Sequence, residues 1–164
     1  MIASLSAPSK NSEMPQPLIR TAVESDVPQC AAMLAILFSQ EREFAPDVEA
    51  QSRALDLIIQ QPELGRIFVA DVDGDVQGMV MLLFTVSTFL GQKVALLEDM
   101  VVAPAWRGKG LGSQLINHAV TFARQERLGR ITLLTDGDNE AAQRFYRAKG
   151  FTPSEMVVFR KLLS

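Results

Sequence analysis

Apolar and polar positions along this chain fall into short runs that predict an ordered succession of strands and helices. Runs typical of strands cover residues 18–23, 67–72, 76–86, 94–102, 131–135 and 156–163. Apolar positions at helical spacing cover residues 47–60, 111–127 and 139–149, and a further helix starts at Ser25 or Asp26 and continues through Leu37 towards Glu43. The predicted order is therefore β-α-α-β-β-β-α-β-α-β.

Glycine positions separate these elements and decide how the strands connect. Asp73 and Gly74 supply the positive φ angles of a tight hairpin turn, and Gly129 and Gly150 are placed to end the last two helices. Strands joined by hairpins are antiparallel, whereas the strand, helix and strand over residues 94–135 form a right-handed parallel crossover. We therefore expect an α/β (α+β) protein with a mixed sheet flanked by helices.

Length and composition indicate one globular domain. The chain has 164 residues, of which 48% are hydrophobic and 21% charged, enough to bury an ordinary core. Residues 1–17 are rich in Ser and Pro and lack the apolar core of a signal peptide, so we expect a flexible tail there and one domain over residues 18–164. No apolar run approaches the roughly 20 residues that span a bilayer. We expect a cytoplasmic protein with no membrane partner.

Charge and residue counts exclude several kinds of partner and site. The net charge of −3 gives no broad basic field for duplex nucleic acid. Cys30 is the single cysteine, so no internal disulfide, zinc pattern or convincing Cys/His pair can be assembled. His118 is the single histidine, and its place on the apolar face of a predicted helix favours core packing over catalysis. We expect no metal.

A glycine-rich basic stretch lies between the strand over residues 94–102 and the helix over residues 111–127. It reads Arg107, Gly108, Lys109, Gly110, Leu111 and Gly112. Amides at a helix N-terminus have no intrahelical acceptor, and the helix dipole favours anions, so such a loop suits a phosphate or pyrophosphate. A plain strand-to-helix turn with packing glycines would rarely need two cations as well.

The spacing of the glycines excludes two common nucleotide motifs. The phosphate-binding loop of nucleotide hydrolases requires G-x-x-x-x-G-K-[S/T], whereas Lys109 lies between two glycines. The glycines also do not match the dinucleotide-binding fingerprint G-x-G-x-x-G, because they lie at positions 108, 110 and 112. Asp136, at the end of the next predicted strand, does lie where that fold places an acid that binds the ribose. A dinucleotide-binding fragment is a weak alternative, because too little chain follows the loop to build a doubly wound sheet.

Two sets of residues occur in a fixed order with a predicted strand between them. The first comprises Val102, Pro104, Trp106, Arg107, Gly108, Lys109, Gly110, Leu111 and Gly112, and the second comprises Asn139, Ala142, Phe145, Tyr146, Gly150 and Phe151. The first resembles the acyl-CoA-binding motif of the GNAT superfamily of N-acetyltransferases, [R/Q]-x-x-G-x-[G/A], and the second is similar to that family's other signature. The resemblance extends over residues 18–163 and implies the GNAT fold, in which a largely antiparallel sheet has one splayed parallel strand pair. It also implies an enzyme that uses acetyl-CoA.

The resemblance implies where this chain binds the cofactor. Backbone groups at the end of a strand pair with the pantetheine arm, and loop amides bind the pyrophosphate with help from Arg107. The cofactor-binding residues implied in this way are Met100, Val101, Val102, Arg107, Gly108, Lys109, Gly110, Leu111, Gly112, Ser113, Asn139 and Tyr146. The side chain of Lys109 is equally well explained as solvated, and Asn139 as a helix N-cap.

Two side chains are candidates for catalysis. Glu98 and Asp99 are adjacent acids in an apolar strand, where the family carries a β-bulge that opens a cleft. An acid facing that cleft can accept a proton from an amine, and Glu98 is the better candidate, although a structural acid explains it equally well. In the family a tyrosine matching Tyr146 protonates the departing thiolate; a half-buried aromatic is the alternative.

The acceptor is less well specified than the donor. By the resemblance it is framed by residues 39–48 and 85–91, where Glu41, Glu43 and Asp47 suggest a cationic amine. We expect direct transfer in a ternary complex to a primary amine, on a small molecule or as a Lys or N-terminal amine. A non-catalytic acyl-CoA sensor is the alternative, and a homodimer through paired strands is compatible with the sequence.

Overall fold

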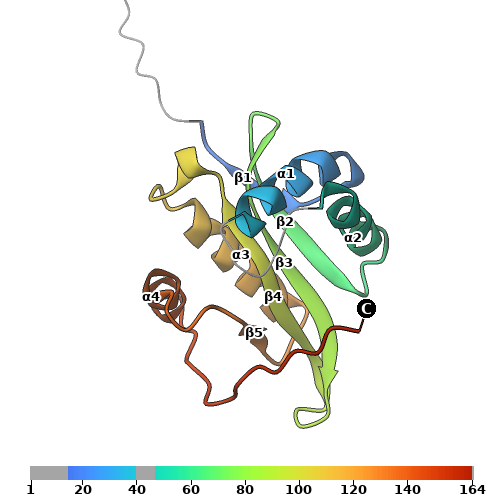
Figure 1. Ribbon diagram of the computed structural model, residues 1–164, viewed down its shortest axis with the longest axis vertical. Helices are drawn as coiled ribbons and strands as arrows, with labels where there is room; N and C mark the ends of the chain where they lie inside the picture. Colours follow the sequence, from blue (N-terminus) through green and yellow to red (C-terminus); the bar gives the residue numbers. More distant parts are fainter. Residues whose placement is uncertain (1–14, 40–46, 164) are drawn as a thin grey trace, which may run out of the picture.

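A mixed five-stranded sheet forms the centre of the molecule (Figure 1). The computed structural model describes residues 15–39 and 47–163. The strands lie side by side in chain order: β1 Leu18–Thr21, β2 Gly65–Val72, β3 Asp75–Ser87, β4 Gln92–Val102 and β5 Ile131–Leu133. The first three pairings are antiparallel, and β4 pairs with β5 in parallel. This mixed topology confirms the predicted fold class.

Helices cover both faces of this sheet (Figure 1). They are α1 Val27–Phe38, α2 Val48–Gln60, α3 Leu111–Gln125 and α4 Glu140–Ala148, with short 3-10 turns at Glu24–Asp26 and Pro104–Trp106. α1 and α2 pack together on one face, and α3 packs on the other with α4 beside it. The sheet is therefore the middle layer of three.

Side chains of the central strands alternate between two apolar clusters. In β2, Ile67 and Val69 join the cluster under α1 and α2, whereas Phe68 and Ala70 join the cluster under α3. Each large side chain buried in this way contributes about 1.5–3 kcal/mol to folding. Because both faces are covered, these strands are apolar at nearly every position, which explains their short continuous apolar runs.

Local turn and start signals were predicted correctly. Asp73 and Gly74 adopt φ angles of 53° and 93° in the hairpin between β2 and β3. Asp47, where the second helix was expected to start, caps α2, since its Oδ1 accepts a hydrogen bond of 3.0 Å from the amide of Ala50. Gly150 follows α4 with a φ of 86°. These residues act through their own backbone conformation or the next turn, so sequence alone suffices to place them.

The end of α3 differs from the prediction. Arg127 adopts a φ of 56°, and the amide of Leu128 donates to the carbonyl of Ala123 at 2.9 Å, so the helix ends before Gly129. A Cβ at Gly129 would overlap only the side chain of Gln92, which is exposed and flexible. Gly129 lies beyond the end of α3, and its amide donates to the carbonyl of Lys93 at 2.9 Å, which joins it to the start of β4.

The prediction of a last strand over residues 156–163 is wrong. This segment forms neither helix nor strand. Its large apolar side chains are 60–91% exposed: Met156, Val157, Val158, Phe159, Leu162 and Leu163. The neighbouring strand β5 has only three residues, and its Ile131 and Leu133 are half-buried where a buried strand was expected. Apolar composition alone does not make a strand, and this segment pairs with none of the described strands.

Some predictions concern residues outside the described part of the chain. These are residues 1–14 of the expected tail and the end of the first helix towards Glu43. In the described residues, no helix is both long enough and apolar enough to cross a membrane.

Arg20 joins β1 to two acids from separate parts of the chain. Its guanidinium donates two hydrogen bonds to Asp26, of 2.6 and 2.9 Å, and one of 3.0 Å to Asp71 in β2. Asp26 is 4% exposed and also accepts the amide of Val23 at 2.8 Å. The hydrogen bonds from Arg20 hold the pKa of Asp26 below its usual 3.8. The pKa of Asp71 is also lowered, by hydrogen bonds from the backbone amide of Gly74 and from Arg20.

We expect Asp26→Asn to lower the free energy of unfolding at pH 7 by about 2 kcal/mol, because the guanidinium of Arg20 loses the more buried of its two charged partners. Since the folded-state pKa of Asp26 is depressed, this stabilisation is present above the unfolded pKa of 3.8 and is lost as the pH falls through the folded value. Urea unfolding at pH 7 and at acidic pH measures both effects. Glu155→Gln, at an exposed acid, is the control; equal stability of Asp26→Asn and the unchanged protein at pH 7 would contradict the expectation.

Candidate active site

A β-bulge interrupts β4 at the acidic pair. Met79 pairs with Val101 and Met81 with Glu98, so β4 advances three residues while β3 advances two. Asp99 absorbs the extra residue with a φ of 49°. The bulge expected from the family resemblance is therefore present, at Asp99.

The parallel pairing of β4 with β5 ends where the bulge begins. It joins Ala95 to Ile131 and ends with Leu97 opposite Leu133. In the described residues, the rest of β4 has no partner strand on this side, which agrees with the splayed pair that the resemblance implies. The stretch of β4 over residues 100–102 therefore has no strand beside it on this side among the described residues.

Glu98 and Asp99 have different surroundings. Glu98 lies opposite Met81 in β3, and Met81 belongs to the apolar cluster under α1 and α2. Because the two residues of a cross-strand pair share one face of a sheet, the carboxylate of Glu98 is directed to that face. Both acids are half-buried. The ion pairs found among the described residues do not include Glu98. This weakens the interpretation of Glu98 as a purely structural acid paired with an arginine.

The basic loop has the backbone conformation of an anion site. Gly108 and Gly110 adopt φ angles of 72° and 81°, and Gly110 is the N-cap of α3. Within the described part of the chain, no backbone acceptor is found for the amides of Gly108, Gly110, Leu111, Gly112 and Ser113. A row of unpaired amides at a helix N-terminus is suited to a multiply charged phosphate.

Two members of the loop already have partners. Nε of Arg107 donates to the carbonyl of Val102 at 3.1 Å, which ties the loop to the end of β4. The amide of Lys109 donates to the carbonyl of Trp106 at 3.4 Å. The backbone amide of Lys109 is therefore a weaker candidate for ligand binding than the sequence suggested, while its exposed ammonium remains available.

Gly112 lets three elements meet. A Cβ at this position would lie 3.1 Å from Cε of Met100 in β4 and 3.6 Å from Cζ of Phe145 in α4. The first distance is tighter than an ordinary contact, so a Cβ here would require the end of the Met100 side chain to give way by a few tenths of an ångström. The glycine loop, the strand after the bulge and the second signature are thereby brought to one place.

The second signature forms a capped helix with an aromatic face. Oδ1 of Asn139 accepts the amide of Ala142 at 3.0 Å, which confirms Asn139 as the N-cap of α4. The ring of Tyr146 packs edge to face against Phe145 and Phe151, with centroids 5.3 and 5.8 Å apart. Burial raises the pKa of the Tyr146 phenol, so the phenol keeps its proton at neutral pH.

Two residues singled out by type have packing roles. The His118 ring packs edge to face on Phe68 with centroids 4.8 Å apart, as expected for a histidine in the core. Burial raises the pKa of the Cys30 thiol to about 12, so this thiol stays protonated at neutral pH and is no nucleophile. In the described residues, no group of three His, Cys, Asp or Glu side chains is placed to hold a metal ion.

The region expected to frame the acceptor is only partly described. Glu41 and Glu43 lie outside the described residues, and the carboxylate of Asp47 caps α2. The end of β3 and the turn after it expose Val86 by 69% and Phe89 by 90%. Of the three acids expected to attract a cationic amine, the one that is described therefore serves as a helix cap.

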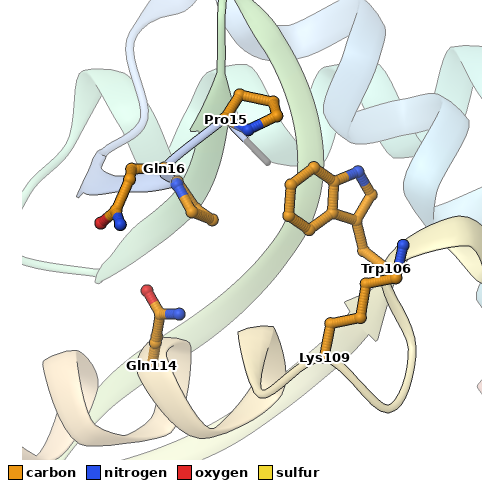
Figure 2. A pocket seen from close by; sticks show the side chains of 6 residues that line it. Pro15, Gln16, Trp106, Lys109 and Gln114 are labelled. Atoms are coloured by element: carbon orange, nitrogen blue, oxygen red, sulfur yellow. The ribbon is translucent and has the colours of Figure 1, made fainter. Parts of the chain in front are cut away.

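A hollow of about 470 Å³ lies next to the glycine loop (Figure 2). Its lining residues are Pro15, Gln16, Pro17, Trp106, Lys109 and Gln114. Residues 15–17, expected to belong to the tail, form one wall of it. No sequence signal pointed to Gln16 or Gln114, because residues in a tail and on an exposed helix face follow no motif.

Comparison with known proteins identifies the family of these signatures. The model of the Acetyltransferase (GNAT) family matches residues 31–151. An uncharacterized N-acetyltransferase of Bacillus subtilis, YhfO, is 32% identical over 136 residues, which cover 81% of this chain and 88% of that protein. Streptothricin acetyltransferase of Streptomyces lavendulae is 38% identical over 87 residues, covering 52% of this chain and 44% of that protein.

A solved structure supports the fold independently. The aminoglycoside N-acetyltransferase AAC(6')-Iy, determined in complex with CoA, superimposes with a TM-score of 0.76. The alignment covers 92% of this chain and 97% of that chain at 20% identity. At this identity the likeness concerns the fold.

We expect Gly110→Val to lower the free energy of unfolding by about 1–3 kcal/mol, because a branched residue is strained at positive φ. It should also abolish CoA binding, since the amides of the loop would be displaced. A Cβ at Gly110 meets nothing within 4 Å, so strain and not collision is the cause. Gly137→Val is the matched control, because Gly137 has equally open space without a positive φ. Calorimetric titration with CoA measures binding; retained affinity in Gly110→Val would contradict the role of the loop.

Proposed function

The chain belongs to the GNAT family of acetyltransferases, and we propose that it transfers an acetyl group from acetyl-CoA directly to a primary amine within a ternary complex. The observation that carries the proposal is the coincidence of three features in one place. These are the bulge at Asp99, the end of the β4 and β5 pairing, and the unpaired amides at the start of α3. Together they provide an extended backbone edge that leads to an anion-binding loop.

The residues present fit the donor. The amides of residues 110–113 would hold the pyrophosphate, because the glycines leave room where a Cβ would project. Backbone groups of Met100, Val101 and Val102 would pair with the amide-containing pantetheine arm, although the carbonyl of Val102 is already shared with Arg107. The side-chain amide nitrogen of Asn139 would extend the same row from α4. Acetyl-CoA supplies the activated acyl group, and the protein positions it.

The acceptor must lose a proton before it can attack. An alkylamine has a pKa near 10.4, so deprotonation at pH 7 costs about 4–5 kcal/mol. Glu98 is the proposed general base, directly or through a water, since it is half-buried beside the bulge and lies outside the ion pairs of the described residues. The amine nitrogen then forms a bond to the carbonyl carbon as the carbon–sulfur bond breaks.

The leaving thiolate needs a proton, and Tyr146 is the proposed donor. Burial keeps the phenol of Tyr146 protonated, and its pKa is raised above the ordinary value. The phenol gives its proton to the thiolate and recovers one from solvent, so the reaction yields an N-acetylated amine and CoA. The rings of Phe145 and Phe151 fix the orientation of the phenol.

A small-molecule amine is the acceptor class that we favour. The name of the Streptomyces lavendulae relative, streptothricin acetyltransferase, supports this class, as does the name of the aminoglycoside N-acetyltransferase that shares the fold. A Lys side chain or an N-terminal amine is the other substrate class that the proposed chemistry accommodates. Location in the cytoplasm and assembly as a homodimer remain predictions from the sequence.

We expect Tyr146→Phe to lower kcat by about 100-fold or more, because the thiolate loses its proton donor. CoA affinity should change less than twofold, since the aromatic packing of the ring is kept. Stopped-flow thiol release and calorimetric titration measure the two effects. Glu140→Gln, at an exposed position of the same helix, is the control. A kcat equal to that of the unchanged protein would remove Tyr146 from the mechanism.

We expect thiol release from acetyl-CoA to depend on the acceptor in a panel of primary amines that includes aminoglycosides, polyamines and peptides with Lys. In the same assay, Glu98→Gln should lower kcat at neutral pH and recover at alkaline pH, where the free amine no longer needs a base. CoA binding without release to any amine would favour an acyl-CoA sensor over an enzyme. An unchanged pH profile in Glu98→Gln would assign the base to another group.

A further inference from the structure

The sheet face that carries Glu98 combines one carboxylate with an open apolar surface. We infer that the acceptor is a small primary amine with a single charge on an apolar body, held with its nitrogen at Glu98 and its body over Leu83 and Leu96. This inference rests on the proposed function, because it concerns the acceptor of the same site. It narrows the small-molecule amines to those with one ammonium group.

The register of three strands places Leu96 in the middle of a row across this face. Its two neighbours in β4 belong to the apolar cluster under α3, so Leu96 is directed to the opposite face, as Glu98 is. Leu96 pairs with Leu83 in β3 and with Thr132 in β5. Leu83 packs against the cluster under α1 and α2, which agrees with this direction. These three side chains, here called the Leu96 row, lie about 7 Å from Glu98 along the strand.

The Leu96 row is accessible to a ligand. Leu83 and Leu96 are half-buried, Thr132 is exposed, and Leu134, directly after β5, is 54% exposed. α1 packs on β3 and β4, α2 packs on β2, and both helices lie away from β5 (Figure 1). A ligand with an apolar body would remove this surface from water, which favours its binding.

Charge on this part of the face is limited to Glu98. From the pair that contains Glu98 towards the hairpin, the other side chains that share the face on β3, β4 and β5 are uncharged: Met81, Leu83, Thr85, Val94, Leu96 and Thr132. The carboxylate of Asp47 is engaged as the cap of α2. A second ammonium over the Leu96 row would lose hydration without gaining a charged partner. The face therefore favours an acceptor with one charge.

An aminoglycoside presents several ammonium groups, and one carboxylate can pair closely with only one of them. The likeness to the aminoglycoside N-acetyltransferase, at 20% identity, concerns the fold and assigns no acceptor to this chain. The side chains around Glu98 are therefore the better guide to the acceptor. They fit an aliphatic or aromatic monoamine.

The first test compares hexylamine with the diamine of the same chain length, which differs by one terminal ammonium. We expect kcat/KM for hexylamine to be at least about tenfold higher, because the second ammonium finds no partner on the Leu96 row. Acceptor-dependent thiol release from acetyl-CoA measures both values. Equal values overturn the inference, and so does a preference for the diamine, a polyamine, an aminoglycoside or a peptide with Lys.

The second test adds a carboxylate to the Leu96 row. Thr132 is exposed, so Thr132→Asp should fold, and we expect it to raise kcat/KM for the diamine relative to hexylamine by about threefold. Thr121→Asp makes the same change at an exposed position of α3, on the other side of the sheet, and should leave the ratio unchanged. An unchanged ratio in Thr132→Asp would place the body of the amine elsewhere and overturn the inference.

The third test removes apolar surface from the row. We expect Leu96→Ala to raise KM for hexylamine about fivefold with little change in kcat, because contact with the body of the amine is lost. Methylamine has no body to place, so its KM should stay the same. Leu57→Ala, at a half-exposed leucine of α2, is the control, and thermal unfolding verifies that each variant is folded. If both amines lose efficiency equally, Leu96 does not select the acceptor and its role is overturned.

Failure of this inference is distinguishable from failure of the proposed function. If no amine releases thiol from acetyl-CoA, the proposed transfer is wrong and the acceptor class is overturned with it. If thiol is released best to an amine with several charges, the transfer stands and only the inference of a single charge is overturned.

Discussion

One extra residue in β4 determines how the site is built. Before the bulge, the side chains of Ala95 and Leu97 belong to the apolar cluster under α3. If side chains alternated regularly along the strand, those of residues 99 and 101 would face the same cluster. Instead, Met100 and Val102 belong to the α3 cluster, and Val101 belongs to the α1 and α2 cluster. The bulge at Asp99 thus inverts the phase of the strand. Aspartate tolerates this positive φ better than most residues, and long pairing with β3 on both sides holds it there.

The inverted phase connects the strand to the rest of the site. Because Met100 is directed towards α3, its side chain lies beside Gly112, where Phe145 of α4 also packs, so strand, loop and second signature converge at this glycine. The carbonyl of Val102 is then at the strand end where Arg107 binds it, which fixes the start of the loop. Pairing with β5 ends at Leu97, next to the bulge, where the extra residue disrupts the ladder locally. The change of phase therefore links the end of β4 to both the glycine loop and the aromatic helix.

Sequence alone predicted the features that are encoded locally. The hairpin at Asp73, the cap at Asn139 and the glycine loop each depend on residues within one turn, and each has the expected conformation. Features that depend on a distant partner were predicted poorly. Gly129 looked like a helix end but lies beyond it, where its amide donates to the carbonyl of Lys93 in β4, and residues 156–163 looked like a strand but pair with none of the described strands. The lining of the hollow by Gln16 and Trp106 also joins segments far apart in the chain.

The same distinction explains why the donor side is easier to interpret than the acceptor side. A pyrophosphate and a pantetheine arm can be bound by backbone groups, and backbone binding requires glycines and a bulge whose positions are fixed in sequence. An acceptor amine must be bound by side chains, which many residue types and positions can supply. Residues that bind the donor should therefore follow the family motif, whereas those that bind the acceptor should be particular to this chain.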